Sequence, residues 1–368
     1  MDKRMILAVA GAGKTYYICN HLNVDDKNLI LTYTNENVNN IIAELYKTYS
    51  EIPEKTSVMT FHAFLNRLLI SPYLTSILQT FSVENIKIRG ITTNKSPSIR
   101  ENNSHNKFYC TKDSFRHYID NSDRLYCDCL GELFVELVKK NSVLGKMILS
   151  NLNKFFDIIL IDEFQDYRCS EYDVLMKIVK SCQNVLLVGD FYQHSVYGAN
   201  NTGKPFKNRT KCLSYDEFKE KLPKKIKIDE TLLIKSRRCS KKICEFISKK
   251  LLIKIDSAGI NNGDVIVIDN QLQADQILLD DNIIKLVYSK SKEQPFLAIN
   301  WSYSKGSTYA GVCVILTNKT EKIIDDDFDV LKMDLGITLN KLYVALTRSS
   351  GDVYLLTSEY VKKYKQNR

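Results

Sequence analysis

The sequence contains no apolar run that approaches the roughly 18 residues of a membrane-spanning helix, and it contains no Cys-x-x-Cys pair. Its first residues, MDKRMILAVAGAG, have the basic start, apolar run and small residues of a signal peptide. That apolar run is too short for such a peptide, and it continues directly into GAGKT, which secretion would destroy. We therefore expect an intracellular, cytoplasmic protein.

The ten cysteines are scattered along the chain and form no pattern that is typical of zinc modules. Cys127 and Cys129 lie two positions apart, with Cys110 and His117 nearby, so a zinc site can be imagined. The second Cys-x-x-Cys or His-x3-His pair that such a site usually contains is missing. We therefore interpret the cysteines as free thiols.

Composition and charge narrow the class of protein. Apolar residues make up 44% of the 368 positions, enough to bury proper cores, which argues against a disordered tail or a disulfide-stabilised miniprotein. The formal net charge is +9, and such an excess favours an anionic partner, usually nucleic acid. The alternative is that the charge only keeps the protein in solution.

Short apolar runs alternate with amphipathic stretches, which predicts an α/β fold built on parallel sheets. Apolar runs that end in polar or Gly-rich residues predict strands, and apolar residues at helical spacing predict helices. The predicted strands cover 5–10, 29–33, 57–60, 156–161, 184–188, 226–234, 265–268, 283–288, 297–300, 312–316 and 353–357. The predicted helices cover 38–49, 131–140, 144–154, 170–182, 241–252 and 339–347.

Two polar stretches indicate how the chain is divided. Residues 71–129 are rich in Ser, Asn, Thr and Lys, which predicts a small inserted subdomain. The segment 198–225 is polar, basic and interrupted by Gly and Pro, which predicts a domain boundary. We therefore expect a first domain over 1–205 and a second over 206–368, in which the strand at 226–234 comes first.

The segment AVAGAGKT, at residues 8–15, follows a predicted strand and precedes a helix, which is the context of a phosphate-binding P-loop. Its two glycines allow successive backbone N–H groups to surround an anion, and the helix N-terminus adds its dipole. Lys14 would neutralise phosphate charge, and the Thr15 hydroxyl would ligate Mg²⁺. Ala8 stands where the strict pattern has its first glycine. The predicted phosphate site comprises Ala10, Gly11, Ala12, Gly13, Lys14 and Thr15.

A pair of acids follows the apolar strand in FFDIILIDEFQD. Acids at this position lie at the C-terminal edge of a parallel sheet, where ligands bind. Asp162 would hold Mg²⁺ through water, and Glu163 would orient or deprotonate an attacking water molecule. The alternative is a solvated turn, which a P-loop in the same predicted domain disfavours.

The sequence resembles superfamily 1 nucleic-acid helicases of the UvrD/Rep/PcrA type. DEFQD is similar to the second motif of that family, and six further segments follow the family order, together covering residues 8–356. The resemblance implies two RecA-like domains of a P-loop NTPase, with ATP bound between them. The further segments are LTYTNENV, TFHAFLNRLL, LLVGDFYQHSVYG (in which His194 is an extra residue), IKSRRCSKKICEFI, SYSKGSTYAGVCVI and LYVALTRSSGDVYLL.

The resemblance also implies roles for individual residues. Gln165 and Gln193 would sense the γ-phosphate and couple it to the nucleic-acid face. Arg238 and Arg348 would reach across the cleft as arginine fingers, with Arg237 as the alternative to Arg238. Single-stranded DNA, with RNA left open, would lie across both domains. The residues implied to contact it are Tyr33, Thr34, Asn35, Thr60, His62, Lys305, Gly306 and Thr308.

Several positions depart from the family pattern. No glutamine that could read adenine precedes the P-loop, and Arg237 stands where the family has an adenine-stacking tyrosine. Tyr16 is the nearby aromatic that could stack on the base instead, so we expect relaxed base selectivity. Ala199 stands where a family aromatic stacks on DNA, and Thr308 replaces a glutamate. The interval from Arg238 to Lys305 is too short for the large accessory domain of UvrD-type enzymes.

Two functions are compatible with these residues. The first is an ATP-dependent DNA helicase or translocase that hydrolyses ATP when bound to single-stranded DNA. The second is a DNA-sensing regulatory ATPase subunit that unwinds weakly or not at all alone, with a nuclease partner such as that of Gabija-type phage-defence systems. The short core favours the second function. Kinases are disfavoured because they lack DEFQD and the second-domain arginines.

Overall fold

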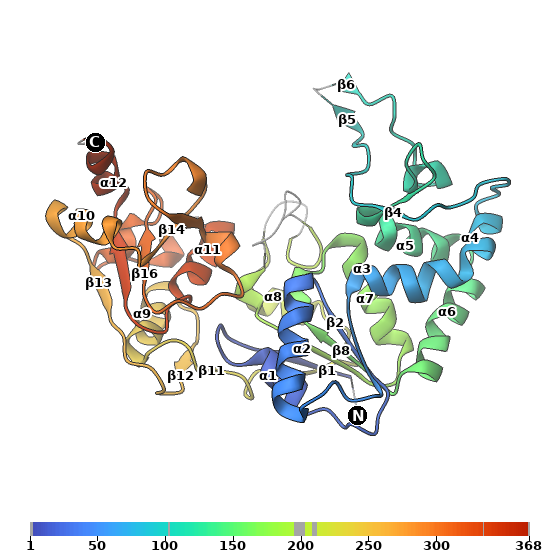
Figure 1. Cartoon of the computed structure of the whole chain (residues 1–368), viewed down its shortest axis with the longest axis horizontal. Helices are drawn as coiled ribbons and strands as arrows, with labels where there is room; N and C mark the ends of the chain where they lie inside the picture. The colour runs from blue at the N-terminus through green and yellow to red at the C-terminus, as the bar shows by residue number, and fades with distance from the viewer. Residues whose placement is uncertain (1–2, 102–103, 195–202, 208–211, 334, 367–368) are drawn as a thin grey trace.

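The structure is a computed structural model that describes residues 3–101, 104–194, 203–207, 212–333 and 335–366. Two parallel sheets form two lobes that lie next to each other (Figure 1). Helices pack on both faces of each sheet, as expected for parallel strands that are buried on both sides. The predicted α/β class, with two RecA-like parallel sheets, is confirmed.

The first sheet contains six strands, all parallel to their neighbours. In three of its central strands every residue is buried and most residues are apolar, a pattern that predicts strands covered on both faces. In spatial order the strands are β10 (Lys227–Asp229), β1 (Arg4–Leu7), β9 (Val185–Gly189), β8 (Ile158–Asp162), β2 (Asn28–Thr32) and β3 (Thr56–Thr60).

The strand predicted at 226–234 does not belong to the second sheet. It is the short strand β10, which pairs with β1 at the edge of the first sheet. The chain therefore leaves the first sheet after Asp229 and not at residue 205. The sequence could not reveal this pairing, because a three-residue strand has the same local pattern at the edge of either sheet.

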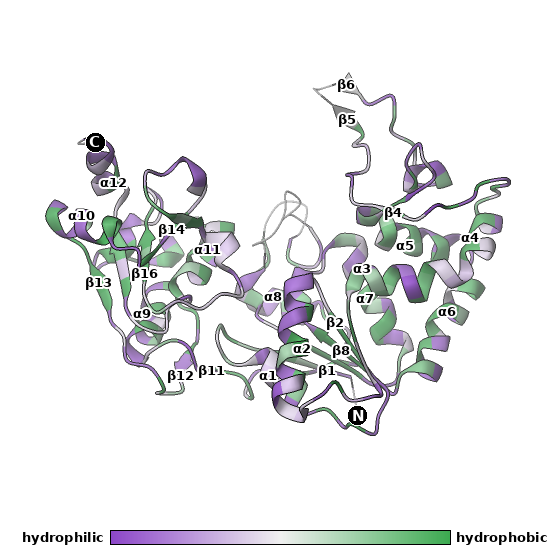
Figure 2. Ribbon diagram, viewed as in Figure 1, coloured by the Kyte–Doolittle hydropathy of each residue, from purple (hydrophilic) through white to green (hydrophobic). Residues whose placement is uncertain are grey.

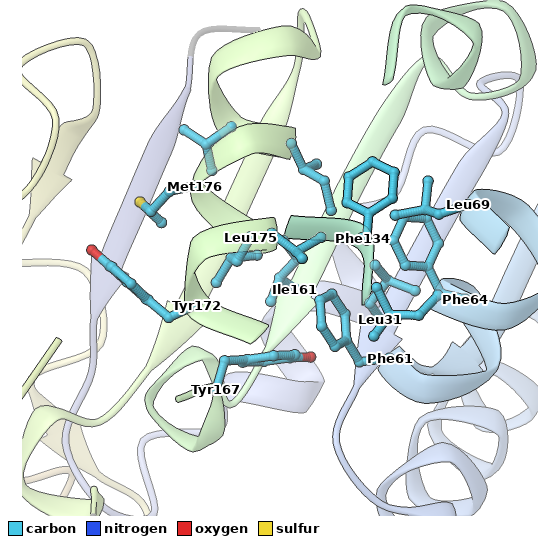
Figure 3. Close-up of a cluster of buried hydrophobic side chains, with 14 of the residues drawn as sticks. Leu31, Phe61, Phe64, Leu69, Phe134, Ile161, Tyr167, Tyr172, Leu175 and Met176 are labelled. Atoms are coloured by element: carbon cyan, nitrogen blue, oxygen red, sulfur yellow. The ribbon is translucent and has the colours of Figure 1, made fainter. Parts of the chain in front are cut away.

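Opposite faces of the first sheet pack against different partners. Met5 and Leu7 point into one core while Ile6 points into the other, as the alternation of side chains along a strand requires. Figure 3 shows the first of these cores, in which Phe61, Phe64 and Phe134 pack beside Leu31 and Ile161. The other face contacts α1, α2 and helices of the second lobe, so the lobes share a continuous apolar core.

The first lobe has helices close to the predicted ranges 38–49, 131–140, 144–154 and 170–182, together with short helices that the sequence analysis did not predict. Some of them begin at a capping residue. Thr34, for example, caps α2 by accepting a hydrogen bond from the Asn37 N–H at 3.1 Å. The helices are α1 (Lys14–Asn20), α2 (Asn35–Tyr49), α3 (Phe61–Phe64), α4 (Leu74–Thr80), α5 (Leu130–Lys140), α6 (Ser142–Phe155), α7 (Cys169–Ser181) and α8 (Tyr215–Glu220).

The second sheet contains five parallel strands with helices on both faces. Figure 2 shows that apolar residues concentrate in the strands of both lobes. The strand order is β13 (Val265–Val267), β17 (Val353–Leu356), β16 (Val312–Ile315), β14 (Ile284–Val287) and β15 (Ala298–Asn300). The helices are α9 (Lys241–Leu251), α10 (Gln271–Leu279), α11 (Ile337–Leu346) and α12 (Ser358–Gln366), and β11 (Lys235–Ser236) pairs with β12 (Asp256–Ser257) beside them.

The segment 71–129 contains little regular structure and projects from the first lobe beside α5 (Figure 1). Its strands are only two residues long: β4 (Ile91–Thr92) pairs with β7 (Leu125–Tyr126), and β5 (Arg100–Glu101) pairs with β6 (Ser104–His105). Phe115 and Tyr118 are buried in the first core, which anchors the segment. Among the described residues, no helix has both the length and the apolar character needed to cross a membrane.

Candidate functional site

The segment between β1 and α1 has the geometry of an anion-binding loop. Gly11 and Gly13 have φ angles of 71° and 82°, which residues other than glycine rarely adopt. The loop is held from both lobes, because Ala8 N–H donates to Gly189 O of the first lobe at 2.8 Å and Ala10 N–H donates to the Tyr343 hydroxyl of the second lobe at 2.9 Å. The successive backbone N–H groups and the start of α1 form the concave surface that a phosphate requires.

Gly11 also allows the second lobe to approach closely. A Cβ atom at this position would lie 2.7 Å from both Arg238 Cβ and Ser236 Oγ. The Arg237 N–H donates to Gly11 O at 2.9 Å, so the chain at 236–238 runs directly against the loop. A residue with a side chain at position 11 would force these two segments apart.

The two acids at the end of β8, Asp162 and Glu163, contact basic and hydroxyl side chains. Lys14 Nζ lies 3.2 Å from Glu163 Oε1, and the Thr15 hydroxyl donates to Asp162 Oδ2 at 3.3 Å. Lys305, from the second lobe, lies 3.7 Å from Glu163 Oε2. Glu163 has a φ of 54°, an uncommon conformation that is found where surrounding structure imposes it, often at functional sites. The two lysines therefore hold the carboxylate of Glu163 from opposite lobes.

Burial and charge shift the pKa values of these acids in opposite directions. Burial and the neighbouring Glu163 carboxylate raise the pKa of Asp162. Burial would also raise the pKa of Glu163, but the ammonium groups of Lys14 and Lys305 outweigh it and lower that pKa. Glu163 therefore carries the negative charge, whereas Asp162 is an acid that a bound cation would stabilise in its charged form.

A hydrogen-bond chain leads from Glu163 to the second lobe. Gln165 donates to the Glu163 carboxylate, and its own carbonyl oxygen accepts from Asp190 N–H at 3.0 Å. Asp190 Oδ2 in turn accepts from Gln193 Nε2 at 2.8 Å and from the Tyr343 hydroxyl at 3.2 Å. Burial raises the pKa of Asp190 to about 6. Both predicted glutamines thus lie in one network with Glu163.

The predicted arginines Arg238 and Arg348 face the loop from the second lobe. Arg348 is fully buried, and its Nε donates to Val344 O at 2.9 Å. Arg238 donates to Thr347 O at 3.1 Å. Burial and the nearby Arg238 charge lower the pKa of Arg348 to about 9.

These groups surround a cavity of about 380 Å³. Gln165 lies behind it with no exposed surface, and Ala10 and Ala12 are buried in the loop wall. The cavity brings together most of the predicted nucleotide and catalytic residues from both lobes. Those that line it are Gly11, Gly13, Lys14, Thr15, Tyr16, Asp162, Glu163, Gln193, Arg238 and Arg348.

The cavity fits a nucleoside triphosphate with a divalent cation. The Thr15 hydroxyl and the Asp162 carboxylate are adjacent oxygen donors of the kind that Mg²⁺ prefers. The loop N–H groups and the cationic side chains of Lys14, Arg238 and Arg348 would face the phosphates. At the cavity mouth the Arg237 guanidinium lies 5.1 Å from the ring centroid of Tyr16. These two side chains offer flat surfaces on which a base can stack.

The predicted nucleic-acid contacts of the first lobe lie together. The Tyr33 and His62 rings are 5.6 Å apart at the ends of β2 and β3. Glu171 joins them: it accepts from the Tyr33 hydroxyl at 3.4 Å and lies 2.9 Å from His62 Nε2. Thr34 caps α2, Thr60 caps α3 with a bond of 3.2 Å from Ala63 N–H, and Asn35 is exposed. Their roles in binding DNA stay predictions.

Three second-lobe residues were predicted to contact DNA, and in the structure they lie at or next to the cavity. These residues are Lys305, Gly306 and Thr308. Lys305 is buried, and its Nζ lies 2.5 Å and 2.7 Å from the two carboxylate oxygens of Asp166. Gly306 and Thr308 line the nucleotide-sized cavity. A contact between Lys305 and DNA would require its ammonium to leave Asp166. Ala199 lies outside the described residues.

Sequence reasoning did not single out Tyr343, Asp190, Asn261 or Asp166. Tyr343 and Asp190 occur inside quoted motifs, LYVALTR and VGDFYQ, so the motifs themselves were the available signal. Asn261 donates to the backbone carbonyls of Arg237 and Arg238, each at 2.9 Å, and lines the cavity. No sequence pattern marks Asn261, because its role depends on a loop that folds back from β12.

Comparisons with known proteins agree with this geometry. A family model for the UvrD/REP helicase N-terminal domain matches residues 74–202. A probable DNA helicase II homolog of Mycoplasma genitalium is 26% identical over 231 residues, which cover 50% of this chain and 33% of that protein. The chain thus matches about a third of the length of this curated relative.

Two solved structures are distantly similar. The first, the structure of PRRSV helicase, has 14% identity and a TM-score of 0.47, with coverage of 97% of this chain and 52% of that one. The second, Arterivirus nonstructural protein 10 (helicase) in complex with DNA, has 12% identity and a TM-score of 0.48, with coverage of 96% and 60%. The family match and the curated relative show that this chain is similar to UvrD-like DNA helicases.

Proposed function

We propose that this protein is an ATP-dependent DNA helicase or translocase, which hydrolyses ATP between its two sheets when single-stranded DNA is bound. The observation that carries the proposal is the shared cavity. Its walls combine a phosphate loop and two acids from the first lobe with two arginines from the second. Such a site is complete only when the lobes are together, so relative motion of the lobes and turnover are coupled.

Bound MgATP would supply the phosphoanhydride bond and the cation that neutralises developing charge. Glu163 is the candidate for orienting and deprotonating water, because its carboxylate is charged and held by Gln165. Lys14 would turn from Glu163 toward the phosphates and free that carboxylate for the water. Arg348 and Arg238 would stabilise charge from the second lobe, an effect worth roughly 10³–10⁵ in rate in other NTPases.

Base recognition would rest on stacking between Tyr16 and Arg237. The pair lies at the cavity mouth with a separation of 5.1 Å, and Tyr16 is 43% exposed. A stacking site reads the flat face that all bases share and not the hydrogen-bonding edge that distinguishes them. We therefore infer that the enzyme discriminates weakly between ATP and other nucleoside triphosphates.

The direct test is ATP turnover by the purified chain with and without single-stranded DNA. The expected result is turnover that rises when an oligonucleotide is added and that disappears in Glu163→Gln. A matched control is Glu171→Gln, which changes a carboxylate near Tyr33 and His62 outside the cavity and should keep basal turnover. Wild-type turnover by Glu163→Gln would contradict the proposed base.

A second candidate function is a DNA-sensing regulatory ATPase that acts through a nuclease partner. One observation favours it: the chain between Arg238 and Lys305 is occupied by α9, α10 and the strands β12–β15, which build the second lobe itself. That interval therefore contributes no accessory domain to hold or split a duplex. Strand displacement on duplexes with a 3′ or a 5′ tail distinguishes the functions. Processive unwinding by the chain alone favours a plain helicase, whereas DNA-stimulated turnover without unwinding favours the regulatory subunit.

A further inference from the structure

A cluster of metal-ligating side chains lies in the first lobe, far along the chain from the P-loop. His117 Nε2, the Cys129 thiol and the Glu132 carboxylate all lie within 4.8 Å of one another. His117 and Cys129 are buried, at 8% and 5% exposure. Cys129 and Glu132 are one helical turn apart at the start of α5, so their side chains point to the same side.

The imidazole of His117 is oriented in the way that metal ligands usually are. Its Nδ1 donates to Cys110 O at 2.7 Å, which directs Nε2 toward Glu132 Oε2 at 2.8 Å. A hydrogen bond from the other ring nitrogen to a backbone carbonyl is the typical outer contact of a metal-bound histidine. The second Glu132 oxygen is paired with Lys112, which would hold the carboxylate in place.

We propose that His117, Cys129 and Glu132 bind a zinc ion. The donor set of one imidazole nitrogen, one thiolate sulfur and one carboxylate oxygen suits Zn²⁺, which accepts all three in tetrahedral geometry. Bond lengths of about 2.0–2.3 Å separate neighbouring ligand atoms by roughly 3.4–3.6 Å. The cluster therefore needs to open slightly between His117 Nε2 and Glu132 Oε2, which are 2.8 Å apart, and the Cys129 sulfur lies within 4.8 Å of both atoms.

The fourth position would be open to a water molecule. His117 also lines a cavity of about 390 Å³, together with Cys110, Arg116 and Asp120. Binding of zinc would release the proton of the Cys129 thiol, because only the thiolate ligates the metal. Cys129 and His117 are two of the residues near which the sequence made a zinc site conceivable, but the missing second Cys or His pair argued for free thiols; the structure adds a carboxylate from α5.

The proposed ion would link the inserted segment to the regular part of the lobe through three protein ligands, with water in the fourth position. His117 belongs to the 3-10 helix Phe115–Tyr118, in a segment whose strands are two residues long, and Cys129 and Glu132 belong to the regular part of the lobe. Small loop-rich units have little core of their own and are commonly stabilised by a metal or a disulfide. This role is independent of ATP hydrolysis.

The competing arrangement is a protonated His117 that pairs with Glu132, while the Cys129 thiol stays hydrogen-bonded with Ser96 and Asp128. In this arrangement a proton lies between His117 Nε2 and Glu132 Oε2, which are 2.8 Å apart. In the proposed site both atoms would contact the zinc ion instead. The thiolate distinguishes the alternatives, because sulfur bound to cobalt(II) gives an intense charge-transfer absorption that a salt bridge cannot give.

The test uses the full chain without an affinity tag. After equilibration with Zn²⁺ and desalting, plasma mass spectrometry should find about one zinc ion per chain. Replacement by Co²⁺ should give the thiolate charge-transfer band and the strong visible bands of a tetrahedral site. Cys129→Ser should lose the charge-transfer band, and Cys127→Ser, two positions away, should keep it. Glu132→Gln should weaken zinc binding at least tenfold.

Three results would overturn the proposal. The first is a wild-type chain that retains no zinc and gives no charge-transfer band with cobalt. The second is a Cys129→Ser variant with an unchanged cobalt spectrum. The third is a thermal midpoint that Zn²⁺ raises equally in wild type and in Glu132→Gln, because a specific site stabilises only the form that binds the ion. None of these measurements depends on ATPase activity, so they test the zinc site separately from the proposed function.

Discussion

Mild acid should destabilise the contact between the two lobes through His194. This ring is 4% exposed and stacks on Phe206 with a centroid distance of 4.4 Å and an interplanar angle of 8°. Its Nδ1 donates to Phe191 O, and its Nε2 lies 3.0 Å from the Asn340 amide nitrogen on α11. A second proton on the ring would place two donors against each other at Asn340, so the contact requires the neutral imidazole.

The size of the effect follows from the shifted pKa. Burial, assisted by the Arg168 guanidinium, lowers the pKa of His194 to about 3. The unfolded chain takes up the proton below a pKa of about 6.5, whereas the folded chain resists it. The contribution of the neutral His194 imidazole to the free energy of unfolding is therefore present above pH 6.5, and it is lost as the pH falls from 6.5 toward 3. At pH 5 the loss is about 2 kcal/mol, or roughly 4–8 °C in the thermal midpoint of a domain of this size.

The assay compares unfolding midpoints at pH 7.5 and pH 5. The sole tryptophan, Trp301, is buried in the second lobe and provides a fluorescence signal. His194→Gln keeps a donor and an acceptor but cannot titrate, so its midpoint should fall less than that of wild type. His21→Gln, a control at an exposed histidine, should behave as wild type. If His194→Gln and wild type lose equal stability between these pH values, the reasoning is wrong.

Three further predictions concern the cavity and the charge. Lys14→Ala should weaken both nucleotide binding and turnover. Glu163→Gln should keep nucleotide binding, measured with a fluorescent analogue, and should release phosphate at least about 10²-fold more slowly. Equal losses of nucleotide binding in both variants would contradict these separate roles. Tyr16→Ala should raise KM for ATP and GTP alike, because stacking of about 1–3 kcal/mol is lost for either base. Tyr46→Ala, at another exposed tyrosine, should change neither KM. A rise in KM for ATP alone would contradict base-independent stacking. Affinity for a pyrimidine oligonucleotide should fall steeply with salt, by about 0.7 log units per log unit of salt for each phosphate contact, and a flat response would mean that the net charge of +9 only solubilises the protein.

Much of the fold was predictable because local patterns were strong. The runs at 156–161 and 184–188 are mainly apolar, and they contain most of β8 and β9 at the centre of the first sheet. The P-loop was predictable for a different reason: its glycines are required by backbone geometry and not by packing. The residues that line the cavity come from motifs that are far apart in the sequence.

The remainder depended on contacts between distant segments. Nothing local to Lys305 indicates that it pairs with Asp166 on the other lobe, because a lysine between two small residues is typical of an exposed loop. Glu132 has the same limitation, since one acid in the first turn of a helix is usually explained by the helix dipole. Such residues acquire a role only from tertiary neighbours, which a single sequence does not specify.

The pairing of β10 with β1 determines how this protein can be divided. A fragment that ended at residue 205 would lack Lys227–Asp229 and would leave the outer N–H and C=O groups of β1 unpaired. An open edge of this kind is a template for pairing with other chains, and here it would lie directly beneath the phosphate loop. The first lobe is therefore separable from the second only beyond Asp229. A shorter piece would lack its edge strand and would be less soluble.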